Sequence, residues 1–208
     1  SYEQDALVAT VETEKEHDQT AYQVFHPQGP LAFLPLSNPR HCSIVWSTAT
    51  AHAEQLMGFN EEEFNQALTK AFSAKLGKVK LVSTRYRFPL YMRHAQNYVG
   101  KNWLLLGDAA HTIHPLAGLG LNVGLADIAC WQQKMQRNKG VLTSARALGA
   151  YQRERKAAVW QTILLMEGFK RLFATSFPPV SLMRAIGLQC CNQLPLLKRL
   201  FIQHAAGG

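Results

Sequence analysis

The sequence predicts an α+β fold in which a mostly antiparallel sheet precedes a series of helices. Short alternating segments fill the first 50 residues, helical periodicity dominates beyond residue 120, and strong turn signals separate the early strands. The chain has 208 residues, of which 47% are apolar and 17% charged. A chain of this size and composition can bury one or two real hydrophobic cores, so disorder is excluded.

The early strands follow from alternation of apolar and polar residues. Strands are predicted over 4–14, 21–25, 31–36 and 42–47, with a further strand over 79–86. The turn at 26–30 contains Pro27, Gly29 and Pro30, which break both helices and strands. About four of these strands are expected to form one antiparallel sheet joined by short loops.

Helices are predicted from caps and from the 3.6-residue period. Asn60 is a good N-cap, Glu63 three residues later completes a capping box, and Gly77 ends a helix over 60–76. A second helix follows residue 121, with an apolar face at Leu121, Leu125, Ile128 and Met135. A long helix is expected over 144–174, and two short ones follow Pro178-Pro179.

The segment from Trp103 to Asn122 is the most informative part of the chain. The apolar run 103–106 predicts a buried strand, and Gly107 with Asp108 ends it with a flexible residue and a carboxylate. Pro115, Gly118 and Gly120 indicate a loop, after which the pattern becomes helical. Backbone N–H groups at a helix N-terminus attract negative charge, so this order of elements predicts a cradle for a polar cofactor.

Several other kinds of site are excluded or disfavoured. The sequence has no phosphate-binding Gly-x-x-x-x-Gly-Lys-Ser/Thr motif and no early Gly-x-Gly-x-x-Gly. His111 and His114 have a metal-like spacing, but Asp108 is the only further candidate ligand nearby, so a structural role is favoured over a metal. The four cysteines show no ligand-like spacing and predict reduced thiols in the cytoplasm.

Positive charge is concentrated toward the C-terminus. The formal net charge is +8, and the chain from Lys134 onward carries twelve Lys and Arg against two acidic residues. Two pairs, Lys170-Arg171 and Lys198-Arg199, lie among apolar residues, which is typical of a helix at an anionic membrane surface. A helix packed on the rest of the protein explains the same pattern, and no nucleic-acid partner is expected because no binding motif accompanies the charge.

The cradle resembles the flavin-binding signature of the class A FAD monooxygenases, the aromatic hydroxylases. The resemblance lies in the pair Gly107-Asp108, in Pro115, and in Gly118-Leu119-Gly120-Leu121-Asn122. It is closer to the hydroxylases of ubiquinone biosynthesis, because it extends to 32–36, 43–46, 88–90 and 182–188. The 2-polyprenylphenol hydroxylase and the 2-polyprenyl-methoxy-benzoquinol hydroxylase both remain open.

The resemblance implies roles for these residues. Gly107 and Asp108 would hold the ribityl chain of FAD, and Pro115 would lie beside the flavin carbon that reacts with oxygen. The backbone from Gly118 to Asn122 would face the flavin edge that becomes negative on reduction, which fixed donors stabilise. A flavin C4a-hydroperoxide would then hydroxylate the ring. Leu119 departs from the Gln that is usual there, which removes a side-chain contact.

The resemblance also implies a domain arrangement. Residues 1–97 would form the substrate domain, 98–140 the second half of the FAD-binding domain, and 141–208 a helical region. The chain would then be a C-terminal fragment of an α/β flavoprotein monooxygenase, without the unit that binds the ADP part of FAD. Such a fragment is expected to bind FAD weakly or not at all, and to self-associate through apolar surface.

The implied substrate and partners complete these expectations. A polyprenylated phenol or quinol is the expected substrate, with NAD(P)H as electron donor and Phe33, Trp46 and Phe88 as walls of the pocket. A ubiquinone-synthesis complex and peripheral contact with the inner membrane are the expected associations. Two alternatives remain open, namely a non-catalytic fragment for membrane docking or complex assembly, and a related flavoprotein reductase or halogenase.

Overall fold

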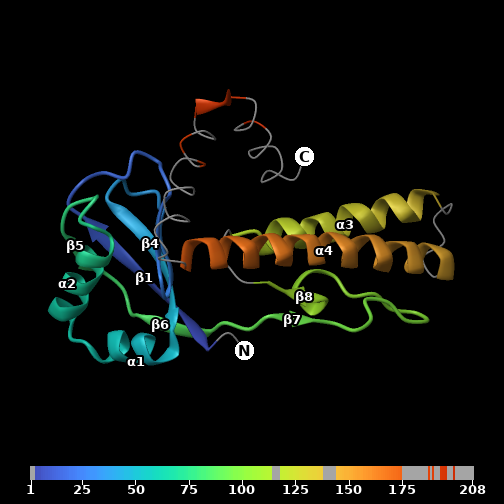
Figure 1. The fold of residues 1–208 in the computed structure, drawn as a ribbon, viewed down its shortest axis with the longest axis horizontal. Coiled ribbons are helices and arrows are strands. Elements are labelled where there is room, and N and C mark those ends of the chain that lie inside the picture. The colour runs from blue at the N-terminus through green and yellow to red at the C-terminus, as the bar shows by residue number, and fades with distance from the viewer. Residues whose placement is uncertain are drawn as a thin grey trace. The chain divides into compact units, whose positions relative to one another are not determined.

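Six strands form the main sheet, and every pairing in it is antiparallel (Figure 1). The computed structural model describes residues 3–113, 118–137 and 144–174 and a few single positions beyond. The strands are β1 (Gln4–Thr13), β2 (Tyr22–His26), β3 (Gly29–Pro35), β4 (His41–Ala49), β5 (Val79–Leu81) and β6 (Tyr86–Pro89). Their order is β2-β3-β4-β1-β5, and β6 pairs with β1 beside β5. The antiparallel sheet is therefore confirmed, with more strands than predicted.

Two helices cover one face of this sheet. Helix α1 (Thr50–Gly58) was not expected from the sequence, whereas α2 (Glu61–Ala71) begins at the predicted cap. The Asn60 side chain accepts from the Glu63 amide, and the Glu63 carboxylate accepts from the Asn60 amide. Fully buried side chains of α2, of its C-cap Phe72 and of the sheet then form one core, which includes Phe64, Leu68, Phe72, Leu7, Val11, Leu31, Phe33 and Ile44.

The strand register decides which side chains share a face, because directly opposite residues in antiparallel strands point the same way. Trp46 lies opposite both Leu7 and Leu31, so it faces the helices. Phe88 lies opposite Ala6, the neighbour of Leu7, and therefore faces away from them. Arg87, the residue before Phe88, points toward the helices, as this alternation requires. Its guanidinium contacts the Glu54 carboxylate of α1 at 2.9 Å.

One turn in this sheet requires its glycine. Gly29 begins β3 with a φ of +144°, a conformation that side-chain-bearing residues rarely adopt. A Cβ at this position would lie 2.2 Å from the carbonyl oxygen of Ser47. The turn predicted at 26–30 is thus confirmed, and its glycine permits close approach of β3 to β4.

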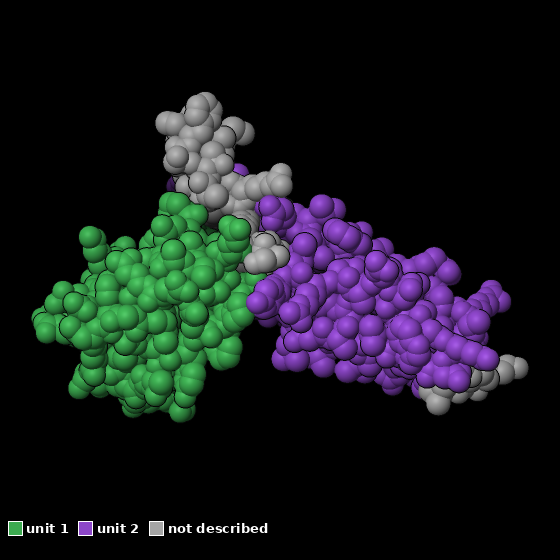
Figure 2. All heavy atoms as spheres, turned by 90° about the horizontal axis from the view of Figure 1, so that it is seen from below, with its two compact units in different colours: residues 1–90 green, residues 91–208 purple. Residues whose placement is uncertain are grey.

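The second unit contains two long helices and a small sheet. The chain divides after Leu90 into units 1–90 and 91–208 (Figure 2). Strands β7 (Arg93–His94) and β8 (His111–Thr112) pair, and a 3₁₀ turn, η1 (Gly107–Ala109), precedes β8. Helices α3 (Gly120–Arg137) and α4 (Ala145–Ala174) pack together around a core that includes Tyr98, Cys130 and Tyr151. Both helices agree with the sequence prediction.

Three expectations need correction. The boundary lies at 90/91 rather than 97/98, because β7 pairs with β8. The regions 98–140 and 141–208 belong to one unit, because α4 packs on α3. The run 103–106 is not a buried strand: Leu104 forms an isolated bridge with Val99, and Trp103 is 49% exposed. A strand needs a ladder of partners, and the described residues supply one bridge.

Some expectations fall on residues outside the described part of the chain. These are the structures around His114 and Pro115, the short helices after Pro178, and the cysteine pair at 190–191. The side chains of Lys170 and Arg171 also lie outside it, although their backbone is part of α4. Among the helices that are described, none combines the length and the hydropathy needed to cross a membrane.

Candidate functional site

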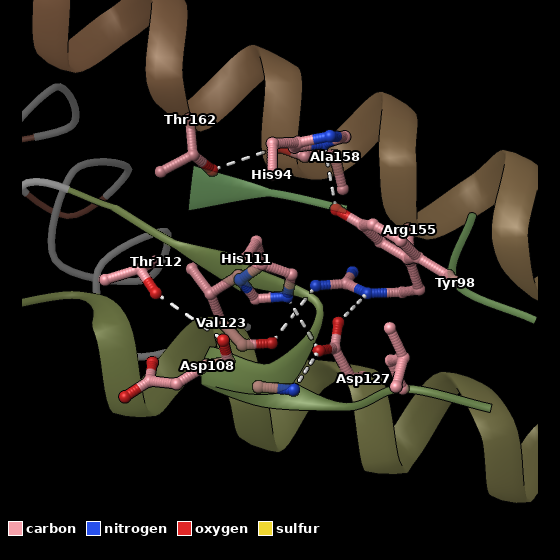
Figure 3. A network of polar contacts seen from close by, with 12 residues as sticks. His94, Tyr98, Asp108, His111, Thr112, Val123, Asp127, Arg155, Ala158 and Thr162 are labelled. Carbon is pink, nitrogen blue, oxygen red and sulfur yellow. Dashed lines mark hydrogen bonds and ion pairs between the residues drawn. The ribbon is translucent and has the colours of Figure 1, made fainter. Parts of the chain in front are cut away.

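The turn at Gly107 and Asp108 is held in an unusual conformation. Gly107 has a φ of +55°, which favours glycine, and the Ala110 amide donates to the Gly107 carbonyl at 2.9 Å to close the 3₁₀ turn. The Asp108 side chain is exposed, and in Figure 3 its carboxylate points away from Asp127. The turn therefore presents a carboxylate at the surface of the second unit.

The fully buried carboxylate of Asp127 binds this turn from α3. Asp127 of α3 is 0% exposed, and its Oδ2 accepts from the Gly107 amide and from His111 Nε2, each at 2.8 Å. Its Oδ1 accepts from Arg155 Nε of α4 at 2.6 Å (Figure 3). Burial alone would raise the pKa of Asp127, but the hydrogen bonds from His111, Arg155 and Gly107 outweigh it and hold that pKa below its usual range.

Two aromatic side chains, Tyr98 and His94, lie next to His111. Tyr98 is fully buried, its ring lies 5.8 Å from that of His111, and its hydroxyl lies 2.9 Å from His94 Nε2. Burial raises the pKa of Tyr98 to about 12, and burial together with the charges of Lys156 and His111 lowers the pKa of His94. Both shifts favour the neutral forms of Tyr98 and His94.

The start of α3 is the other half of the predicted cradle. Gly118 has a φ of +64°, and a Cβ at Gly118 or Gly120 would meet no atom of the described residues within 4 Å. The first turn of α3 contains no acidic residue of its own. The backbone around Gly118 and Gly120 is thus open to a ligand, and the helix presents its positive end without neutralisation from that turn.

The other predicted cradle residues lie at this helix start. Leu119 is half-buried, whereas Leu121 and Asn122 are exposed. Pro115, the residue predicted to lie nearest the flavin ring, is outside the described residues. His111 was considered as a metal ligand, but the structure gives it a hydrogen bond to Asp127 instead. The described residues contain no group of three or more His, Cys, Asp or Glu suited to a metal ion.

The three residues predicted to wall a substrate pocket do not come together. Phe33 is fully buried and stacks on Phe72 with ring centroids 3.8 Å apart. Trp46 lines a cavity of about 460 Å³ on the helix-covered side. Phe88 is 54% exposed on the opposite side of the sheet, as the register requires. The prediction of one shared wall is therefore wrong, because successive strand residues face opposite ways.

Sequence reasoning missed the residues that anchor the cradle. Asp127, Arg155 and Gly124 were not selected as site residues, and the apolar face predicted for α3 is largely exposed, at 74% for Leu121 and 53% for Leu125. One signal was present in the sequence: Asp127 is the only acidic residue between Asp108 and Glu154. A lone carboxylate on a helix beside apolar residues often has a buried cationic partner.

The fold and the site together define a class of protein. A glycine turn that carries an exposed acid, placed beside an open helix N-terminus, is suited to a cofactor with both hydroxyl groups and an electron-rich edge. The chain belongs to the family described as FAD binding domain, whose model matches residues 3–165. The exposed carboxylate of Asp108 and the open backbone at Gly118 and Gly120 fit such a cofactor.

Comparison with individual proteins narrows the class. The chain is 35% identical over 209 residues to "Ubiquinone hydroxylase UbiL" of Rhodospirillum rubrum, covering 99% of the chain and 48% of that protein. It is 34% identical over 216 residues to "3-demethoxyubiquinol 3-hydroxylase" of Escherichia coli, covering 99% of the chain and 53% of that protein. The chain therefore spans about half the length of the curated relatives it matches.

A solved structure supports the fold. The "p-nitrophenol 4-monooxygenase PnpA" of Pseudomonas putida superposes with a TM-score of 0.71 at 16% identity, covering 99% of the chain and 53% of that protein. At this identity the likeness concerns the fold alone. The prediction that the chain has the fold of part of a flavoprotein monooxygenase is confirmed.

Proposed function

We propose that this chain is the part of an FAD-dependent monooxygenase that holds the flavin ring and the substrate, and that the enzyme hydroxylates a polyprenylated phenol or quinol in ubiquinone biosynthesis. The observation that carries the proposal is the match over 99% of the chain to two proteins named as hydroxylases of ubiquinone or its precursors. The geometry of the Gly107 turn and of the start of α3 supports it.

In this proposal the residues of the chain position the cofactor. Asp108 accepts hydrogen bonds from the ribityl hydroxyls, and the backbone from Gly118 to Asn122 faces the electron-rich edge of the ring, with Pro115 beside the ring. The bound flavin supplies the activation of molecular oxygen. The protein contributes fixed donors that need no reorganisation and a surface that excludes water. Because the side chain of Leu119 is hydrophobic, it donates no hydrogen bond to the electron-rich edge of the ring. The backbone N–H groups are the donors that contact this edge.

We infer that the substrate contacts the face of the sheet opposite to α1 and α2. Phe88 and Tyr86 both lie on this face, because alternate residues of β6 share a face. These two rings are 54% and 57% exposed, and Val8 and Val45 lie on the same face opposite or beside them. Phe33 and Trp46 face α1 and α2 and are not part of this surface. An exposed apolar face of this kind fits a substrate that carries an isoprenoid chain.

The electron donor and the associations remain part of the proposal. NAD(P)H is the donor we infer, because a monooxygenase must reduce its flavin before oxygen reacts. A polyprenyl chain partitions into membranes, which supports peripheral contact at the cytoplasmic side of the inner membrane and a place in a ubiquinone-synthesis complex. The basic pairs at 170–171 and 198–199 are the candidate contacts with anionic lipid.

Self-association is expected for the 208-residue chain in isolation. On α3 a stripe of Leu121, Leu125 and Ile128 is 51–74% exposed, and Leu164 of α4 is 67% exposed. Exposed apolar stripes at helical spacing are favourable contact surfaces. Light scattering should therefore report a mass above that of the monomer. A single species at 23.3 kDa would contradict this expectation.

The test of the proposed function is isotope incorporation. The gene product, expressed whole and supplied with NAD(P)H and a short-chain prenylphenol under ¹⁸O₂, should give a ring hydroxyl that carries the label. Asp108→Ala should lower both flavin content and product, whereas the matched control Glu16→Ala removes an exposed acid of the first unit and should change neither. Flavin-loaded protein that forms no hydroxylated product would overturn the proposal.

A further inference from the structure

Two parts of the cradle come from separate segments of the chain. Asp108 lies on the turn after residue 106, and the backbone donors lie at the start of α3, beyond residue 117. A flavin that contacts both parts needs them at a fixed separation, since misplacement by about 1 Å at a cofactor or substrate site already weakens function. Contacts between these two segments must therefore set the distance between the turn and the start of α3.

Direct packing brings the turn against α3 but does not orient it. A Cβ added to Gly124 would lie 3.3 Å from the Cα of Gly107, so the backbone of the turn rests on the helix. The amide of Gly107 then donates to Asp127 Oδ2 at 2.8 Å, which fixes the direction of the peptide plane that leads into Gly107 and on to Asp108. A hydrogen bond to a buried carboxylate is stronger than one between neutral groups.

Arg155 ties the same carboxylate to the beginning of α3. Its Nε donates to Asp127 Oδ1 at 2.6 Å, and its Nη2 donates to the carbonyl oxygen of Val123 at 3.2 Å. Val123 lies in the first turn of α3, directly after Asn122, and its amide donates to the Leu119 carbonyl at 2.9 Å. The guanidinium therefore links the helix start, where the backbone donors lie, to the carboxylate that holds the turn.

His111 completes the arrangement from β8. Its ring is 2% exposed, and Nε2 donates to the oxygen of Asp127 that also accepts from Gly107. The ionised carboxylate thus receives hydrogen bonds from the turn, from β8 and from α4, while it belongs to α3. Its charge is balanced locally by Arg155, which leaves Asp108 as the exposed acid of the turn.

We propose that Asp127 is a positioning residue for the flavin. Its carboxylate binds the Gly107 amide directly and binds Arg155 and His111, and these contacts lock the Gly107–Asp108 turn to the start of α3. This inference rests on the proposed function for its ligand. Asp127 itself is fully buried and acts through the turn, so it makes no contact with the cofactor. Loss of its charge is expected to loosen the cradle in addition to any loss of stability.

The test separates positioning from stability. Asp127→Asn keeps the shape of the side chain but places an NH₂ group where a carboxylate oxygen accepts from Arg155 or from Gly107 and His111. Val159→Ala is the matched control: it truncates a fully buried side chain one turn along α4 from Arg155 and leaves the network intact. Arg155→Lys keeps the charge but loses the two-directional donor fork.

Two readouts are measured on these variants. In the 208-residue chain, hydrogen exchange of the Gly107 to Ala109 amides, followed by NMR, should accelerate in Asp127→Asn and stay unchanged in Val159→Ala. In the gene product expressed whole, the FAD dissociation constant of Asp127→Asn should rise about tenfold relative to Val159→Ala at an equal loss of melting temperature. Arg155→Lys should fall between the two.

Equal FAD affinity of Asp127→Asn and Val159→Ala at matched stability would overturn the positioning role, and so would unchanged amide exchange at Gly107. If the wild-type gene product binds no FAD, the proposed function fails, and the exchange measurement still decides whether Asp127 locks the turn. The two failures are thereby distinguishable.

Discussion

Replacing Asp127 with alanine is expected to lower the free energy of unfolding of the second unit by about 3–5 kcal/mol. The reason is that Arg155, which is 8% exposed, would keep its charge without a partner, and the Gly107 amide and His111 would lose their acceptor. Hydrogen exchange resolved by peptide measures the effect. Amides of 118–137 and 144–174 should lose protection, while those of the first unit serve as the internal control.

A double variant supplies a further control. Asp127→Leu combined with Arg155→Met removes both charges, so it should recover part of the loss. Recovery is incomplete because the Gly107 amide and His111 still lack their acceptor. A loss below about 1 kcal/mol in Asp127→Ala would show that the pair is not desolvated as the structure indicates.

Acid should act on the same carboxylate. The pKa of Asp127 is lower in the folded chain than its ordinary value, so the unfolded chain binds the proton more readily. The contribution of Asp127 to stability is therefore complete above about pH 4 and is lost as the pH falls through the folded pKa. Protection of the second unit should decline in this range, and Asp127→Asn should lack that part of the pH dependence.

Phe33→Ala is expected to lower the free energy of unfolding of the first unit by about 3–5 kcal/mol. Its ring is fully buried and stacks on Phe72 with an interplanar angle of 16°, so truncation leaves a cavity and removes an aromatic pair. Phe88→Ala, on the other face of the sheet, should change stability by no more than about 0.5 kcal/mol, because its ring is half exposed.

The two phenylalanine variants also test the face opposite to α1 and α2 as the substrate surface. Urea unfolding followed by NMR signals of β3 and β4 measures stability, and turnover of the gene product expressed whole measures function. Phe88→Ala should raise the substrate KM at nearly unchanged stability. Similar losses of stability in both variants would contradict the strand register, because they would place Phe88 in the core.

The elements that the sequence identified correctly share a local cause. The capping box at Asn60 and Glu63 satisfies backbone groups within three residues of each other, and α2 begins there. The turn at Gly29 and the helices α3 and α4 likewise follow from residues that are close in sequence. The turns at Gly107 and Gly118 were predicted for the same reason, since a turn with a positive φ usually requires glycine.

The features that the sequence did not reveal depend on contacts between distant segments. The pattern of α3 showed an apolar face but not which side is buried, and the structure turns Asp127 inward toward Arg155, 28 residues away. Phe33 and Phe88 look alike in sequence, and only the pairing of β6 with β1 and of β3 with β4 separates their faces. A one-residue change in register would exchange those faces.

The sequence by itself determined the family, the turn at Gly107, the start of α3 and the type of fold, because these depend on short motifs and local periodicity. The tertiary structure decided what holds the turn and the start of α3 together. A buried carboxylate is costly unless several donors converge on it, and convergence of Gly107, His111 and Arg155 on Asp127 requires three separate segments to meet. That meeting is a property of the folded chain, which no local pattern records.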